Sequence, residues 1–369
     1  MPMPRVFTVI ILTHNRPEFL RIALAALRRQ TYRHLEIVVL VNGATPKTIE
    51  CVREAAAADA RVKPIYFSEN QYRQDDPQHV IHVCFNAGLQ VAAGDYVWYQ
   101  NDDDLLADDY AEKMVALFEG HPECTTAAGV PMSIDLHGRV IESGPRTVNH
   151  RPRYVPGHLL ALDVLGGGSR MFSAPGTIFT IKREVLRRAG GYHRAIELSH
   201  LYGIVPFGVT GFDETAITYW RRHEGQLNRR LSAQGWIGFR ESCDLLRDWE
   251  LERRWQVFGA LVARQVVSDL ERQLCSGAAE WCANHALAGR PGASWCLLRQ
   301  AGRHPWFWRE LPGHLATGLR REVLDPGARK IGQWVRTRVH IKGVNPTGAC
   351  QGAGPTAGQK ERVSPVRSV

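Results

Sequence analysis

The stretch VWYQNDDDLL, from Val97 to Leu106, contains the two features that decide how this chain folds. Its first half is an apolar and aromatic run, which is typical of a strand buried inside a sheet. Three carboxylates, Asp102, Asp103 and Asp104, follow directly, with no neighbouring cation in the sequence. They therefore form either a solvated turn, in which a carboxylate caps the next helix, or a site for a hard cation such as Mg²⁺ or Mn²⁺.

Three further apolar runs lie upstream and also predict buried strands. With the run before the acidic trio, the four runs cover 6–12, 37–41, 62–67 and 96–100. Helical patterns such as 80–92 and 108–119 separate them, which predicts a parallel sheet of Rossmann type with right-handed crossovers. Ligands bind at the carboxyl ends of the strands in such sheets. We therefore expect THN (13–15), VNG (41–43) and NDDD (101–104) to converge on one crevice.

The pattern changes after residue 124. Segments 125–134 and 140–142 flank a His-Gly turn and predict a hairpin. Residues 143–175 are rich in Gly, Pro and Arg, which favours a long loop. Two further strands are expected at 177–181 and 216–220.

Composition limits the class of protein. The 369 residues are 44% hydrophobic and 22% charged, which is typical of a soluble globular chain. No apolar run is long enough to span a bilayer, and the N-terminus lacks a secretory signal pattern. The eight cysteines are scattered without a CxxC pair, so we interpret them as reduced thiols in a cytoplasmic protein.

The net charge of +9 is concentrated near the C-terminus. From His285 to Lys342, eleven Lys and Arg stand against three acidic residues, a net of +8. We expect a basic helical region at 232–342 and a disordered tail at 343–369. The Trp and Arg side chains of residues 304–342 suit an anionic membrane surface, or alternatively the aromatic side chains pack on the preceding domain and leave a solvated basic face.

Several segments resemble family 2 glycosyltransferases of the GT-A fold. They are VIILTHNRPEFLRIALAALRRQTYRHLEIVVLVNG, FNAG, GDYVWYQNDDDLL, LRRAGGYHRAI and TAITYWRRHEGQLN. The resemblance implies an α/β, Rossmann-like GT-A catalytic domain at 1–231 with a mostly α-helical C-terminal extension. It also implies transfer of a sugar from a nucleotide donor to an acceptor hydroxyl, usually with inversion.

The resemblance also implies roles for individual residues. Asp102 and Asp103 occupy the metal-motif positions, with His223 as a further ligand of Mn²⁺ or Mg²⁺, and Asn101 stands where relatives carry a leading Asp. The expected donor-binding residues are Thr13, His14, Asn15, Asn42, Asn86, Asp102, Arg221 and Arg222. Asn86 has an alternative role as a structural link to a neighbouring loop.

The catalytic residues implied by the resemblance are Glu197 as general base and His223 beside the leaving diphosphate, with Asp213 as a reserve base. Val41 stands where many relatives have an Asp that recognises uracil. Because valine cannot form that hydrogen bond, UDP, GDP and dTDP donors all stay open.

Membrane binding by the basic region would suit a glycan or lipid-linked acceptor in cell-envelope synthesis, and a protein at the inner face of the cytoplasmic membrane. A catalytically silent nucleotide-sugar-binding or scaffold protein is the alternative. Binding of nucleic acid through the basic region is not expected, since no recognised module is present.

Overall fold

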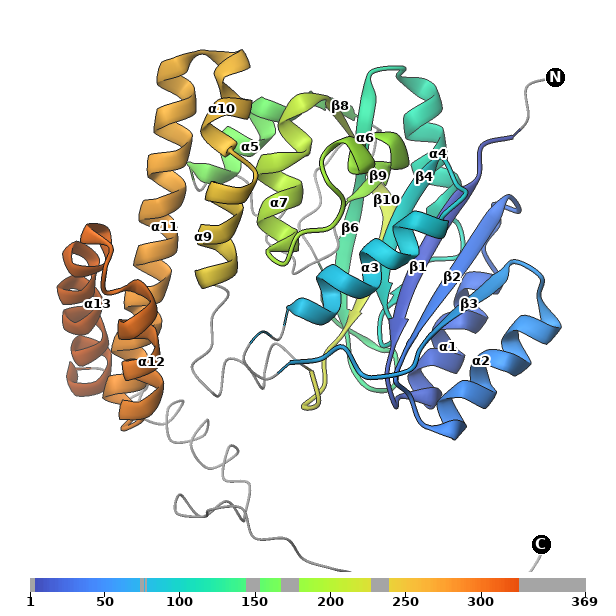
Figure 1. The fold of residues 1–369 in the computed structure, drawn as a ribbon, viewed down its shortest axis with the longest axis horizontal. Coiled ribbons are helices and arrows are strands. Elements are labelled where there is room, and N and C mark those ends of the chain that lie inside the picture. The colour runs from blue at the N-terminus through green and yellow to red at the C-terminus, as the bar shows by residue number, and fades with distance from the viewer. Residues whose placement is uncertain are drawn as a thin grey trace, which may run out of the picture. The chain divides into compact units, whose positions relative to one another are not determined.

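The computed structural model describes residues 4–73, 76, 78–143, 153–166, 179–226 and 239–324. These residues form one mixed sheet with helices on both faces (Figure 1). The strand order is β3-β2-β1-β4-β9-β6-β10-β5, with β7 beside β6 and β8 beside β10. By its internal contacts the chain divides into two units, Met1–Ala316 and Thr317–Val369, and everything below concerns the first.

The strands are β1 (Phe7–Thr13), β2 (Leu35–Asn42), β3 (Val62–Phe67), β4 (Tyr96–Asn101), β5 (Leu105–Leu106), β6 (Cys124–Ile134), β7 (Val140–Ser143), β8 (Arg153–Pro156), β9 (Thr180–Lys182) and β10 (Val209–Arg221). The helices around the sheet are α1 (Pro17–Arg28), α2 (Pro46–Ala58), α3 (His79–Val91), α4 (Tyr110–Gly120), α5 (Gly157–Leu165), α6 (Arg183–Arg188), α7 (Ile196–Gly203) and the 3₁₀ turn η2 (Val205–Phe207). The later elements are α9 (Phe239–Asp248), α10 (Leu251–Trp255), η3 (Gln256–Phe258), α11 (Ala260–Leu287), α12 (Pro291–Ala301) and α13 (Pro305–Leu324).

The N-terminal half of the sheet is parallel, as the sequence predicts. Strand β1 pairs in parallel with β2 on one side and β4 on the other. Thr13 lies opposite Val41, and Leu12 lies opposite Asn101. The segments that follow these three strands therefore converge at one edge of the sheet, which confirms the expected crevice.

Burial on both faces explains the continuous apolar runs. Along β1, Ile10 packs into one core layer with α3, α5 and α7, while Val9 and Ile11 pack into a second with α1, α2 and α4. Successive strand residues point to opposite faces, so a strand covered by helices on both sides has no solvent-facing position to make polar.

The second half of the sheet is mixed rather than parallel. Strand β9 runs antiparallel to both β4 and β6, whereas β10 is parallel to β6. The predicted hairpin is confirmed as β6 and β7. The prediction of a long loop at 143–175 is wrong for its described part, 153–166, because β8 pairs with β10 and α5 follows directly. Partner strands distant in sequence decide such short segments, and local composition does not reveal them.

The helices after residue 239 pack on the sheet's own core. Trp255 at the end of α10 is fully buried, and its indole N–H donates to the carbonyl of Tyr202, at 2.9 Å. Ala263, Val266 and Leu270 of α11 belong to the same core layer as α5 and α7. Helix α10 and the first half of α11 thus pack on the sheet domain.

A smaller core joins α11, α12 and the start of α13. Its buried residues are Cys275, Ala278, Ala279, Cys282, Leu297, Ala301 and Phe307. Within the described ranges, no helix is both long and apolar enough to cross a bilayer. The predicted boundaries at 231 and 342 and the tail at 343–369 lie outside the described residues, so they stay predictions.

Candidate active site

The acidic trio lies in the turn where β4 ends, and Asp102 and Asp103 are buried there. The carboxylate of Asp102 accepts a hydrogen bond from the Thr13 hydroxyl at the end of β1, at 2.7 Å. Helix α4 begins only after Asp109, and no side chain caps it. The interpretation of the trio as a solvated turn with a capping Asp104 or Asp108 is therefore wrong.

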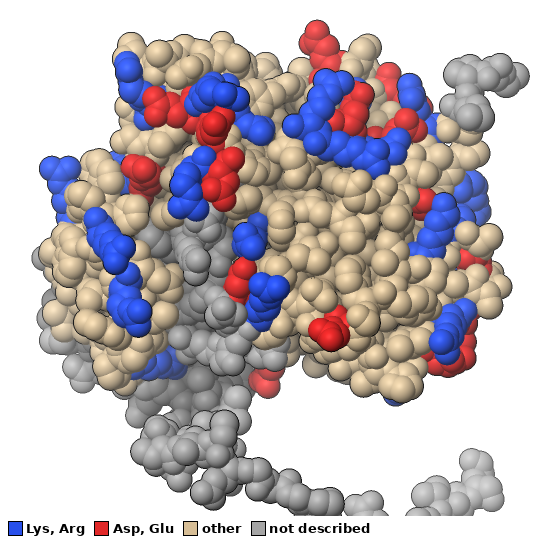
Figure 2. Space-filling view, in the orientation of Figure 1, with Lys and Arg blue, Asp and Glu red and all other residues tan. Residues whose placement is uncertain are grey.

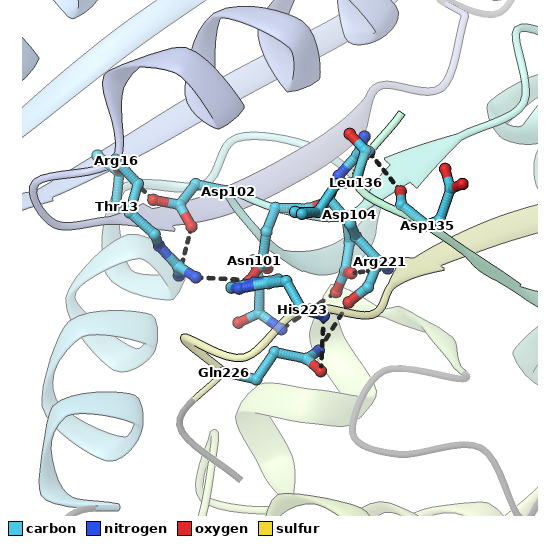
Figure 3. Close-up of polar contacts among 11 residues, drawn as sticks. Thr13, Arg16, Asn101, Asp102, Asp104, Asp135, Leu136, Arg221, His223 and Gln226 are labelled. Carbon is cyan, nitrogen blue, oxygen red and sulfur yellow. Dashed lines mark hydrogen bonds and ion pairs between the residues drawn. The ribbon is translucent and has the colours of Figure 1, made fainter. Parts of the chain in front are cut away.

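Arg16 supplies the positive charge that the neighbouring sequence lacks. It precedes α1, and its guanidinium bridges two carboxylates, with Nη2 2.5 Å from Asp102 Oδ1 and Nη1 2.5 Å from Asp103 Oδ2 (Figure 3). Burial alone would lower the pKa of Arg16, but the two carboxylates raise it above its usual value. Sequence reasoning missed this residue, although it lies in the same loop as Thr13 and His14.

His223 completes the group from the far end of β10. Its Nε2 lies 2.8 Å from Asp103 Oδ2, and its ring packs against Phe19 with centroids 5.2 Å apart. Burial would raise the pKa of Asp103, but the hydrogen bond from His223 and the charge of Arg16 lower it below its usual value. Asp103 is therefore held as a carboxylate between two nitrogen-bearing side chains.

Arg221 forms the framework of the site. Its buried guanidinium donates to the backbone carbonyls of Asp103, Asp135 and Leu136, at 2.9 to 3.0 Å. Figure 3 shows how it ties the turn after β4 to the turn after β6. Gln226 donates in turn to the Arg221 carbonyl, at 2.7 Å. This geometry gives Arg221 a positioning role in place of the expected direct contact with a donor.

The outer carboxylates of the trio are poised to hold protons. Burial raises the pKa of Asp102 to about 7, with the negative charge of Asp103 adding to the effect of burial. Burial and the same neighbour raise the pKa of Asp104 to about 8. The Asn101 side chain donates to Asp104 Oδ2 at 3.2 Å, so the residue that replaces the leading Asp supports the turn.

The donor set fits a metal ion with few protein ligands. Among the described residues, no group of three or more His, Cys, Asp or Glu side chains could hold a metal. Asp103 and His223 offer a carboxylate oxygen and an imidazole nitrogen side by side, a combination that suits Mn²⁺ or Mg²⁺ with several positions left for other oxygens. Asp102 is engaged by Thr13 and Arg16.

A second polar group lies beside the first. His14 Nδ1 donates to the Asn42 carbonyl at 2.7 Å, and the Asn42 amide donates to Asn70 Oδ1 at 2.8 Å. Asn70 follows β3 and was missed by sequence reasoning, although the rule that polar residues after buried strands converge would have found it. Gly43, at φ +53°, permits this arrangement, because a Cβ there would lie 2.3 Å from the Asn70 nitrogen.

Asn15 and Asn86, both expected to bind a donor, instead hold backbone segments. Asn15 does not cap α1; its Oδ1 accepts from the Thr45 amide at 2.7 Å. Asn86 on α3 both donates to and accepts from the backbone of Tyr192, at 2.8 and 2.7 Å. Gly191, at φ +84°, lets Asn86 approach, since a Cβ would lie 2.2 Å from Asn86 Oδ1. The alternative of a structural link thus fits Asn86 better.

Arg222 is engaged by two neighbouring side chains. Its guanidinium stacks on the Trp220 ring, 3.2 Å from the centroid, and its Nε donates to the Ser133 hydroxyl at 3.2 Å. Val41 is buried near the end of β2, and its side chain forms part of the core. Val41 therefore contributes no polar group to the crevice.

The two candidate bases differ in their surroundings. Glu197 is the second residue of α7, and its side chain lies outside what the structure describes. Asp213 is a strand residue of β10, not a loop residue as its GFDET sequence suggested, and it accepts from Thr215 within a register shift of that strand. It lies eight residues before Arg221, toward the opposite end of β10 from the site.

Residues 8–188 match the model of glycosyl transferase family 2. An uncharacterized glycosyltransferase of Haemophilus influenzae is 30% identical over 115 residues, 31% of this chain and 42% of that protein. The GalNAc(5)-diNAcBac-PP-undecaprenol beta-1,3-glucosyltransferase of Campylobacter jejuni is 31% identical over 120 residues, 32% of this chain and 36% of that protein. This chain therefore spans less than half the length of either relative.

The fold is shared with a solved structure. S. aureus TarS 1–349 in complex with UDP superposes with a TM-score of 0.51 at 13% identity, covering 86% of this chain and 91% of that one. The likeness confirms the α/β GT-A fold with a helical C-terminal region that the sequence predicts. Residues 8–188, just under half of this chain, are thus similar to glycosyl transferase family 2.

Proposed function

We propose that this protein is a metal-dependent, inverting glycosyltransferase that moves a sugar from a nucleotide donor to an acceptor hydroxyl. The observation that carries this proposal is the pairing of Asp103 with His223 at 2.8 Å. The pair follows the carboxyl ends of β4 and β10, and Arg16, two positions after His14, bridges Asp103 to Asp102. Phosphate and base would thus occupy adjacent parts of one crevice.

Asp103 and His223 would hold Mn²⁺ or Mg²⁺ together with the donor diphosphate. When bound, the cation neutralises the negative charge that develops on the leaving diphosphate. Arg16 holds Asp103 and Asp102 in place before the donor arrives, because it bridges both carboxyl groups. Arg221 and Gln226 hold the segment that carries His223 in position.

The nucleotide would contact the group formed by His14, Asn42 and Asn70. Their side chains offer both donors and acceptors of hydrogen bonds, and Thr13 and Asp102 lie next to them for the ribose. Val41 offers no such group, so recognition of the base depends on the asparagines and on His14. Discrimination among UDP, GDP and dTDP would therefore depend on Asn42 and Asn70.

Glu197 is the proposed general base. It lies in the first turn of α7, after the segment that Asn86 anchors through Tyr192. A carboxylate that removes the acceptor proton while the diphosphate leaves from the opposite face gives inversion at the sugar carbon.

The proposed acceptor is a glycan or lipid-linked sugar of the cell envelope. The support is the Campylobacter relative, which is named for glucosyl transfer onto a PP-undecaprenol-linked glycan. An acceptor of that kind lies at a membrane, which favours a peripheral protein at the inner face of the cytoplasmic membrane.

One observation favours the alternative of a catalytically silent sugar-nucleotide-binding protein. Arg16 already offsets the charge of Asp102 and Asp103 without any metal. A silent protein would bind nucleotides equally well with and without Mn²⁺ and would neither transfer nor hydrolyse a nucleotide sugar.

A thermal-shift screen of UDP-, GDP- and dTDP-sugars, with and without Mn²⁺, tests the proposal. A ligand that binds only the native state raises the unfolding temperature, so the true donor should stabilise the protein most when the cation is present. Hydrolysis of that donor should then depend on Mn²⁺ and disappear in Asp103→Ala. Metal-independent binding without turnover would replace the enzyme proposal by the silent one.

A further inference from the structure

Helix α12 exposes tryptophan and arginine on one face. Trp295 is 61% exposed, and Arg299 and Arg303 are also exposed. Trp295 and Arg299 are four positions apart on α12 and therefore lie on one side of the helix, and Arg303 follows in the turn after the helix ends at Ala301. Leu297 and Ala301, on the opposite side, are buried against α11. The exposed face is therefore not needed for packing of the helices.

A second exposed tryptophan extends this face. Trp308, 51% exposed, donates its indole N–H to the carbonyl of Gly302 at the end of α12, at 2.7 Å. Gly302 is seven positions after Trp295, two helical turns or about 10 Å along the axis. The two indoles thus mark the ends of one exposed stripe, with Arg299 between them.

The stretch of sequence that contains this stripe is basic. No Asp or Glu occurs between Glu280 and Glu310, a stretch that contains Arg290, Arg299, Arg303 and Arg309. Glu310 itself is partly buried and accepts a hydrogen bond from Ser276. On the face of the molecule shown in Figure 2, Lys and Arg side chains lie over α12 without Asp or Glu.

We propose that the Trp295–Arg299–Arg303–Trp308 face, the α12 stripe, docks the protein on an anionic lipid surface. The proposal deepens the proposed function, since it names the surface that would bring the crevice to a membrane-borne acceptor. Tryptophan favours the bilayer interface, where its ring enters the headgroup region, and the N–H of Trp308 is already satisfied by the Gly302 carbonyl. Arginines beside it are attracted to anionic headgroups, and shallow insertion needs no shape-complementary partner.

Flotation of the full chain with vesicles tests the stripe. Wild-type protein should float with vesicles of equal parts phosphatidylglycerol and phosphatidylcholine, and should stay behind with phosphatidylcholine alone or at high salt. The variant Trp295→Ser/Arg299→Gln/Arg303→Gln should partition at least about tenfold less, since two charges and one indole are lost. Circular dichroism checks that the variant is folded.

A matched control separates this surface from net charge. Arg53 and Arg188 are exposed on α2 and α6, each beside an exposed glutamate. The variant Arg53→Gln/Arg188→Gln loses the same charge and should float as wild type does. An equal loss of flotation in both variants, or no loss of flotation in the stripe variant, overturns the proposal. A concentration-dependent dimer that only the stripe variant abolishes, without flotation of wild type, would assign the surface to a second copy of the chain and overturn it too.

The docking proposal and the proposed function fail in different ways. The stripe variant should retain wild-type transfer or hydrolysis of the donor with a soluble, lipid-free acceptor, because α12 contributes nothing to the crevice. Flotation without any turnover would leave the docking surface standing and remove the enzyme. Turnover without flotation would leave the enzyme standing and remove the docking surface.

Discussion

Nε2 of His223 lies 2.8 Å from Oδ2 of Asp103, although 120 positions separate the two residues in the chain. The contact joins the end of β10 to the end of β4, two strands that do not pair with each other. Asp103→Asn keeps the shape of this contact but removes the charge that a cation needs. We expect transfer to fall at least about 100-fold and Mn²⁺-dependent donor binding to disappear in calorimetry.

The control for this prediction is Asp248→Asn, which removes an exposed carboxylate far along the sequence in α9. It should bind donor and turn over as wild type does. Wild-type turnover in Asp103→Asn would remove the acidic trio from the catalytic machinery.

Arg16→Ala should lower the stability of the metal-free protein and increase its stabilisation by metal. The change leaves the buried carboxylates of Asp102 and Asp103 without their counterion, which costs about 2 kcal/mol or more of stability. Added Mn²⁺ should then raise the unfolding temperature of the variant by more than that of wild type, because the cation replaces the lost charge. An equal shift in both proteins would show that the cation binds elsewhere.

The raised pKa of Asp104, about 8, predicts a pH dependence of stability. Below that pH the folded chain holds a proton that an unfolded carboxyl, with its pKa near about 4, has already released. Stability therefore falls as the pH rises from 5 to 8, by at most about 1.4 kcal/mol per pH unit. Asp104→Asn lacks this titration, so urea unfolding in metal-free buffer should favour the variant increasingly as the pH rises. Parallel pH profiles would contradict the prediction.

Glu197→Gln addresses the base. Transfer should fall by about 10² to 10⁴-fold, while the affinity for the donor changes little, because the amide cannot accept the acceptor proton. Asp213→Asn is the comparison, and it should keep most of the transfer activity since Asp213 bonds within its own strand segment. The opposite outcome for the two variants would exchange their roles.

Trp255→Ala measures how firmly the later helices are joined to the sheet domain. The fully buried indole fills the core between α7 and α11, so its loss should cost about 3–5 kcal/mol in urea unfolding. Trp295→Ala, at an exposed position of α12, should change stability by less than about 0.5 kcal/mol. A small effect at Trp255 would mean that the helices fold independently of the sheet.

The sequence predicts the parallel half of the sheet because each of its strands is buried on both faces and leaves an unbroken apolar run. It predicts the convergence of Thr13, Asn42 and Asp102 for the same reason, since the ends of neighbouring parallel strands share an edge. It does not predict β8 or the strand character of Asp213, because these depend on pairing with segments far away in the chain.

Charge neutralisation at the site was hidden for a similar reason. Arg16 lies 87 positions from Asp103, and one arginine in a loop says nothing about which carboxylate it will pair with. The roles of Arg221 and Asn86 depend equally on their partners. Local sequence shows that both are polar residues near the crevice. Only the fold shows that their side chains form hydrogen bonds to backbone groups.

The burial of Trp255 sets a limit for anyone who shortens this protein. The family match ends at residue 188, which suggests cutting the chain soon after β10 to obtain a minimal protein. Such a truncation would remove α10 and α11 from one core layer and expose its apolar side chains to water. The shortened protein would then aggregate during expression. A soluble minimal version has to extend at least through Leu270.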